Sequence, residues 1–143
     1  MIIAHAPLAS SLKAVAEHAY PECGGLIEAL DVGPADAIEN IEAAARAMLQ
    51  RVRDPEALIF TDVFGATPCN VARRLADSSQ VGVITGVNVP MLWRALCYVS
   101  EPLESVARRA MAGGTQGVFQ VLGAEPAVAK SNVGGNDQDE HHD

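Results

Sequence analysis

His5 is the residue in this sequence best placed to do chemistry, because it stands at the end of a predicted strand and ahead of a predicted helix. A neutral imidazole is a good nucleophile toward phosphorus near neutral pH when its other ring nitrogen keeps its proton. A carboxylate bonded to that second nitrogen fixes the tautomer and stabilises a positively charged ring. Asp62, at the end of another predicted strand, is the candidate for this role. On spacing alone, a packing role for His5 and a turn-capping role for Asp62 are the more common alternatives.

The elements that must position these residues follow from hydrophobic periodicity. Short apolar runs alternate with longer amphipathic segments, which is typical of an α/β domain with a mainly parallel sheet covered by helices. We expect strands at residues 2–5, 26–32, 57–62, 81–85 and 117–122, and helices at 7–20, 36–53, 67–77, 90–99 and 102–112. Thr67 is expected to supply an N-cap oxygen, and Gly113 with Gly114 to end the last helix.

Three segments follow strand ends and should meet at one edge of a parallel sheet. They are residues 5–7, 61–68 and 85–90. Open α/β sheets place their sites at this edge, where loops and helix N-termini converge. The helices beginning near Pro7 and Thr67 would aim backbone N–H groups at the oxygens of a phosphoryl group.

Composition limits the classes of protein to consider. The chain of 143 residues fits one domain, and its 49% hydrophobic content is enough for a packed core. A net charge of −8 would repel a nucleic-acid backbone, so nucleic-acid binding is not expected. Cys23, Cys69 and Cys97 lack the spacing of a metal site or a disulfide framework and are interpreted as reduced, mostly buried thiols.

The two ends of the chain carry weaker signals. No secretory signal and no apolar run long enough to span a bilayer is recognised, so we expect a cytoplasmic protein. Residues 125–143 are polar and acidic and are expected to form a disordered tail beyond a domain at 1–124. His141 and His142 are interpreted as part of that solvated tail rather than as metal ligands.

Two motifs carry a resemblance to a known family. Residues 60–72, F-T-D-V-F-G-A-T-P-C-N-V-A, resemble the T-D-x-x-G-G-S-P-x-N-x-A segment of mannose-family enzyme IIA domains of the sugar phosphotransferase system. Residues 84–92, I-T-G-V-N-V-P-M-L, are similar to that family's I-T-G-x-N-L-P-M-L segment. His5 matches its phosphorylated histidine, and the resemblance runs in register from residue 1 to about 122.

The resemblance implies a phosphorelay function. His5 would accept a phosphoryl group from the histidine-containing phosphocarrier protein and pass it to a separate IIB partner, with Asp62 bonded to its ring. The phosphate-binding set implied is Thr67, Ala66, Gly65 and Ala6. No metal or organic cofactor is required, because a phosphoramidate already holds a reactive phosphoryl group.

The resemblance also implies an open sheet with helices on both faces and a homodimer. In that dimer the last strand, residues 117–122, would be antiparallel and exchanged between protomers. The membrane would be reached only indirectly, through IIC and IID partners.

Departures from the family pattern keep other functions open. Ala6 and Ala66 replace glycines, which gives the backbone less freedom around a phosphate. One alternative is a slower or regulatory relay. Another is a binding module whose phosphorylation at His5 controls a target without onward transfer. The related subunit that serves dihydroxyacetone kinase is a third, and the segment at 84–92 speaks against it.

Overall fold

A four-stranded parallel sheet forms the centre of the molecule. The computed structural model describes residues 1–77 and 79–124. The strands are β1 (Ile2–His5), β2 (Ala29–Val32), β3 (Ala57–Thr61) and β4 (Val81–Ile84), in the order β2-β1-β3-β4. Every strand pair is parallel, which confirms the expected open, mainly parallel α/β sheet. β1 and β3 lie at its centre and carry the most completely buried apolar runs, as central parallel strands do.

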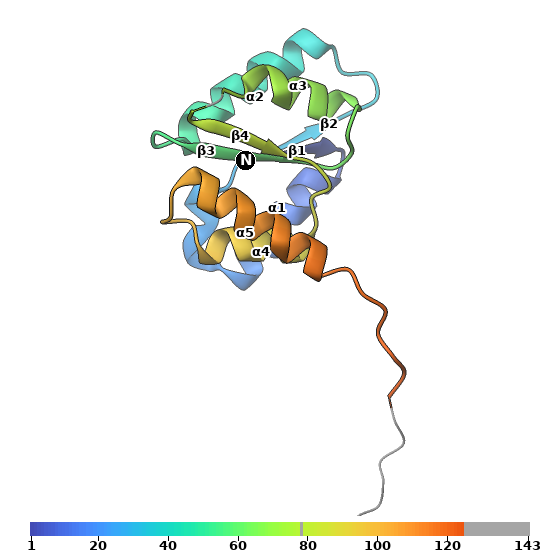
Figure 1. Ribbon diagram of the computed structural model, residues 1–143. Coiled ribbons are helices and arrows are strands. Elements are labelled where there is room, and N and C mark those ends of the chain that lie inside the picture. The colour runs from blue at the N-terminus through green and yellow to red at the C-terminus, as the bar shows by residue number, and fades with distance from the viewer. Residues whose placement is uncertain (78, 125–143) are drawn as a thin grey trace, which may run out of the picture.

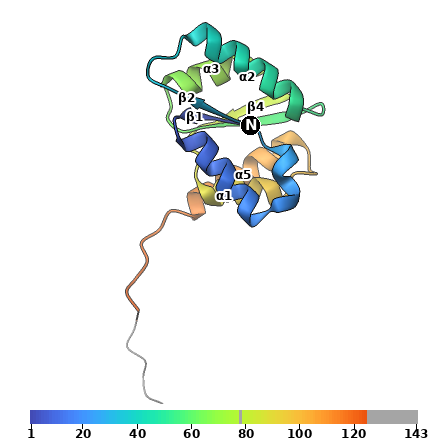
Figure 2. The ribbon, with the colours of Figure 1, turned by 180° about the vertical axis from the view of Figure 1, so that it is seen from behind.

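Helices cover both faces of this sheet, as expected (Figures 1 and 2). One face is covered by α2 (Ile38–Val52) and α3 (Thr67–Leu75). The other is covered by α1 (Leu8–Ala19), α4 (Val89–Cys97) and α5 (Leu103–Gln116), with a 3₁₀ helix, η1 (Pro21–Leu26), beside α1. The residues predicted to begin the second strand at Leu26 therefore belong partly to η1, and β2 starts only at Ala29.

The alternation of side chains along β1 divides the interior into two apolar cores. Ile2 and Ala4 pack with α1, α4 and α5, whereas Ile3 packs with α2 and α3. This period of two is the reason that a run of four residues can hold both helical layers on the sheet. The strand that anchors both layers also ends at His5.

The predicted last strand is absent from this chain. Residues 117–124 have no regular secondary structure, and Val118, Phe119, Val121 and Leu122 are 73–83% exposed. α5 directs this segment away from the sheet, so no strand edge of the described residues lies beside it (Figure 1). Because a strand forms only when its backbone groups pair with another strand, the strand expected at 117–122 is not formed in the described chain, and its exchange with a second protomer stays a prediction.

The glycine pair in α5 packs against α4 and does not end the helix. α5 continues to Gln116, beyond the predicted end near residue 112. A Cβ atom at Gly113 would lie 2.7 Å from Cβ of Arg94, and one at Gly114 would lie 2.7 Å from Cε of Met91. These glycines therefore allow two helices to approach closely, and the expected helix stop at Gly113 is wrong.

Two further expectations concern membrane-spanning helices and the C-terminal tail. No helix in the described part of the chain is long and apolar enough to cross a membrane. The predicted tail at 125–143, including His141 and His142, lies outside the described residues.

Candidate active site

His5 and Asp62 meet at the carboxyl ends of two neighbouring strands. His5 ends β1, and Asp62 directly follows β3, its partner in the sheet. Oδ2 of Asp62 lies 2.7 Å from Nδ1 of the His5 ring and accepts a second hydrogen bond, 3.0 Å long, from the His5 backbone N–H. Oδ1 accepts from the backbone N–H of Val63 at 2.9 Å. The structure therefore brings together the two residues that the sequence singles out.

The charge of Asp62 determines which ring nitrogen is available. Partial burial raises the pKa of Asp62, but the hydrogen bonds from the backbone and ring of His5 and from Val63 outweigh it and hold the pKa below its ordinary value. The carboxylate is thus ionised at neutral pH and can only accept, so Nδ1 of His5 is the donor. In the neutral imidazole, Nε2 then carries the lone pair.

The two side chains differ in exposure in the way a nucleophile and its orienting group should. The side chain of His5 is 53% exposed, whereas that of Asp62 is 10% exposed. Nδ1 is already bonded to Asp62, so Nε2 is the ring nitrogen left for an incoming group. The arrangement can support nucleophilic attack by His5 and stabilisation of a cationic ring by Asp62.

The loop between β3 and α3 places the other predicted residues close to this pair in sequence. Gly65 has a φ of +83°, in the left-handed region that favours glycine, and the Nδ2 amide of Asn70 donates to its carbonyl at 3.3 Å. Ala66 is the N-cap residue of α3, and no side chain caps the helix. Thr67 is the first helical residue, so the expectation that it supplies the N-cap oxygen is wrong. The first-turn N–H groups of α3 have no partner within the helix.

Ala6 has a more restricted position than the loop residues. Its backbone N–H donates to the carbonyl of Val32 at 2.9 Å and so extends the pairing of β1 with β2. A role for Ala6 beside a phosphate therefore rests on its small side chain rather than on its N–H.

The third predicted segment joins the same edge of the sheet through Asp62 itself. The N–H of Gly86 donates to the Asp62 carbonyl at 3.1 Å, and that of Val87 to the Thr61 carbonyl at 3.0 Å. Asn88 caps α4, accepting from Met91 N–H at 3.0 Å, and its amide donates to the Gly114 carbonyl at 3.2 Å. Residues 84–92 thus hold the backbone of Asp62 and tie α5 to α4.

Sequence reasoning missed one contact near His5. Asp31 on β2, the register partner of Ala4, accepts hydrogen bonds from the backbone N–H and the hydroxyl of Ser10, at 3.0 and 2.5 Å. It thereby holds the first turn of α1, which follows His5 by three residues. The available signal was a carboxylate, Asp31, within the strand expected at 26–32.

Comparison with solved structures identifies the fold. The mannose/sorbose-specific IIA subunit of the phosphotransferase system from Enterococcus faecalis is 23% identical, with a TM-score of 0.73 over 87% of this chain and 95% of that one. A phosphotransferase component EIIA from Streptococcus agalactiae is 21% identical, with a TM-score of 0.68 over 83% and 93% of the two chains. No curated protein sequence matches.

The sequence itself matches a family model over residues 1–111. That model is the mannose-type EIIA model, described as "PTS system fructose IIA component". The chain therefore belongs to the mannose-type EIIA family and is a phosphotransferase component of the sugar phosphotransferase system. The match covers β1 through most of α5, so it includes His5, Asp62 and both motifs.

Proposed function

We propose that His5 accepts a phosphoryl group from the histidine-containing phosphocarrier protein and passes it to a separate IIB partner, in sugar uptake or its regulation. The observation that carries the proposal is the 2.7 Å contact between Nδ1 of His5 and Oδ2 of Asp62. This contact leaves Nε2 with a lone pair on a half-exposed ring. The family match supports the same class of reaction.

The phosphoryl transfer needs no co-reactant, because one phosphorus–nitrogen bond forms as another breaks. The Nε2 lone pair of His5 forms a bond to the phosphorus of the donor phosphohistidine. The phosphorus–nitrogen bond of the donor breaks, and its electron pair stays on the donor imidazole. The His5 ring, still protonated on Nδ1, becomes cationic and is stabilised by the Asp62 carboxylate. The same step in the opposite direction passes the phosphoryl group to a nucleophile of the IIB partner.

The loop after Asp62 is proposed to hold the phosphoryl oxygens. The Thr67 hydroxyl and the backbone N–H groups of Gly65 and the first turn of α3 are the donors in this proposal. Ala66, whose N–H donates to the Val63 carbonyl at 3.5 Å, contributes its small side chain. The positive end of the α3 dipole favours an anion at this position. The left-handed conformation of Gly65 allows the loop to curve between Asp62 and the helix.

A homodimer is also proposed, with residues 117–122 exchanged between protomers. Four apolar side chains of this segment are exposed, and β4 lies at the edge of the sheet. A groove beside that edge is lined by Val83, Ile84, Met111 and other residues of β4 and α5. Light scattering should give about twice the chain mass of 15.0 kDa, and a mass of one chain at micromolar concentration would contradict exchange.

Reconstitution tests the relay. The protein is incubated with phosphoenolpyruvate, the general phosphotransferase components and a IIB protein, and phosphate on each chain is followed over time. The relay predicts that label appears on this chain first and on IIB afterwards. Label that stays on this chain in the presence of each IIB protein of the same cell would favour the regulatory module.

A further inference from the structure

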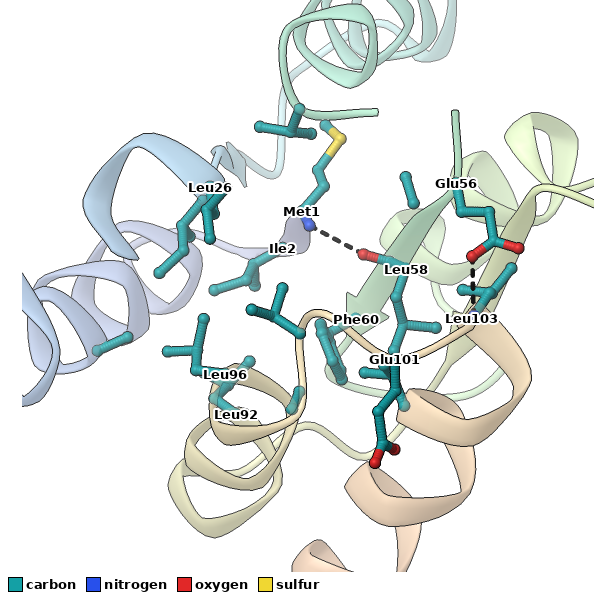
Figure 3. Close-up of a pocket in the computed structure, with 17 residues that line it drawn as sticks. Met1, Ile2, Leu26, Glu56, Leu58, Phe60, Leu92, Leu96, Glu101 and Leu103 are labelled. Atoms are coloured by element: carbon teal, nitrogen blue, oxygen red, sulfur yellow. Dashed lines mark hydrogen bonds between the residues drawn. The ribbon is translucent and has the colours of Figure 1, made fainter. Parts of the chain in front are cut away.

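An apolar cavity lies on the α1, α4 and α5 side of the sheet, near the amino ends of the strands and so opposite to His5. Its walls come from the start of β1, from β3, and from α4 and α5 (Figure 3). Ile2, Phe60, Leu92 and Val106 belong both to these walls and to the hydrophobic core on this face. The cavity is therefore a gap in the packing of this core, and neither His5 nor Asp62 lines it.

The lining is mainly apolar, and its polar groups are two carboxylates and the Met1 amino group. Oε2 of Glu56 accepts from the backbone N–H of Leu103 at 2.8 Å. Both oxygens of Glu101 accept from the guanidinium of Arg109, at 2.7 and 3.0 Å, and one also accepts from the hydroxyl of Ser105. In Figure 3 the carboxylate of Glu101 points away from Met1 and Ile2. Both carboxylates thus hydrogen-bond to α5, and most of the remaining lining is hydrocarbon.

The amino group in the wall is also satisfied within the chain. The Met1 nitrogen donates to the carbonyl of Leu58 at 2.9 Å, as the dashed line in Figure 3 shows. Burial lowers its pKa to about 5, against a smaller opposing effect of Glu28, so this group is uncharged at neutral pH. The Met1 amine, Glu56 and Glu101, the polar side chains and terminus of the lining, thus each make at least one hydrogen bond within the chain.

The size and the opening of the cavity define what fits. Its volume is about 160 Å³. An engineered apolar cavity of about 150 Å³ stays dry and binds benzene, which sets the scale. Leu26 and Val99 line it while remaining 48% and 49% exposed, so apolar side chains extend to its solvent side. A ligand can enter beside these two side chains without opening the sheet.

We infer that this cavity is a second binding site, for an uncharged, compact, apolar ligand of about one aromatic ring. The match between the roughly benzene-sized volume and a mainly apolar wall carries this assignment. The site is distinct from the phosphoryl-transfer site, because the two share no residue and lie toward opposite ends of β1. It would be present whether or not His5 is phosphorylated.

Toluene is the probe for the full-length protein, followed by two-dimensional amide NMR and by the melting temperature. Wild-type protein should show saturable shifts at Ile2, Leu92 and Leu96 and none at His5, and toluene should raise its melting temperature. Benzoate should bind at least about tenfold more weakly, because the carboxylates of Glu56 and Glu101 in the lining repel its charge. Benzylamine should also bind more weakly than toluene, because its ammonium must lose water while both carboxylates are already held by hydrogen bonds to α5.

Ala95→Leu places three more carbon atoms into the cavity from α4, where Ala95 lines it. This variant should bind toluene at least about tenfold more weakly, because the apolar contacts are then made by the chain itself. Leu96→Phe is a second filling variant for the case that Ala95→Leu does not fold. Ala112→Leu adds the same atoms at an exposed position of α5 and should leave binding unchanged, as should His5→Ala.

Three results would overturn the assignment. They are no saturable binding of toluene up to its solubility, shifts that map instead to the groove at Val83 and Val118, and unchanged affinity in a folded filling variant. Tighter binding of benzylamine than of toluene would contradict the uncharged class of ligand.

Discussion

Oδ2 of Asp62 accepts two hydrogen bonds from one residue, His5: one from its backbone N–H at 3.0 Å and one from ring Nδ1 at 2.7 Å. The carboxylate therefore fixes the main chain and the ring of His5 together. The two residues are 57 positions apart in sequence and meet because β1 and β3 are neighbours in the sheet. The sheet order, rather than any local motif, sets the orientation of the imidazole.

Asp62→Asn tests the part of this relationship that depends on charge. The amide keeps the shape of the carboxylate but cannot neutralise a cationic ring, so we expect phosphoryl transfer to slow by about 10²-fold or more. Initial rates of labelling by the phosphocarrier protein measure this. Asp54→Asn, at an exposed position before β3, is the matched control and should keep the wild-type rate. A wild-type rate in Asp62→Asn would exclude an electrostatic role.

The lowered pKa of Asp62 predicts that its contribution to the free energy of unfolding falls at acid pH. The unfolded carboxyl titrates near its ordinary value of about 3.9, and the folded one titrates below it. The stabilisation is thus fully present above that pH and is lost as the pH falls through the folded value. In urea unfolding, the free-energy difference between wild type and Asp62→Asn should shrink as the pH falls below about 4. A difference that grows as the pH falls below about 4 would contradict the sign.

Phe64 is predicted to contact the phosphoryl donor. It follows Asp62 by two residues, is 72% exposed, and lies next to Val63, which is 55% exposed. We expect Phe64→Ala to raise the KM for the phosphocarrier protein by about tenfold, because a buried aromatic contact is worth about that much at an interface. Labelling by phosphoramidate, a small donor with no protein surface, should not change.

The control for this substitution is Val15→Ala, which removes an exposed apolar side chain from α1 and should change neither reaction. Both variants should keep a stability within about 0.5 kcal/mol of wild type. If Phe64→Ala slowed labelling by the phosphocarrier protein and by phosphoramidate equally, Phe64 would affect His5 itself rather than the docking of a protein.

Gly113→Ala is predicted to destabilise the fold although it replaces glycine within a helix. The change gains about 1 kcal/mol of helix propensity. The new Cβ would lie 2.7 Å from Cβ of Arg94, and such overpacking costs about 1–3 kcal/mol. Chemical unfolding should therefore show a net loss of up to about 2 kcal/mol. Gly25→Ala, whose Cβ would meet nothing within 4 Å, should lose no stability; a stabilised Gly113→Ala would refute the close packing of α4 and α5.

The apolar runs and short motifs of the sequence predicted the strands and the loops that follow them. The apolar runs of β1, β3 and β4 and the motifs after them were enough to bring His5, Asp62 and the loop at 84–92 to one edge. The segment at 117–122 has strand-like residues, but strand formation depends on a partner edge that a sequence does not display. Gly113 was interpreted as a helix stop because its packing against Arg94 depends on tertiary structure.

The same distinction holds within the site. The pairing of Asp31 with Ser10 depends on the register of β2 against β1, which periodicity does not give. The position of Thr67 within α3, rather than before it, depends on the geometry of the loop at Gly65 and Ala66. Residue type identified the candidates, and the sheet topology determined which of them meet.

The position of the phosphoryl group on His5 is the most direct test of the proposed relay. The protein is phosphorylated from phosphoenolpyruvate through the general components, and the product is observed by ¹⁵N and ³¹P NMR with His18→Ala as the matched histidine control. We predict one acid-labile, alkali-stable phosphoryl group per chain on Nε2 of His5, present in His18→Ala and absent from folded His5→Ala. Label retained in His5→Ala, or carried on Nδ1 of His5, would contradict the account.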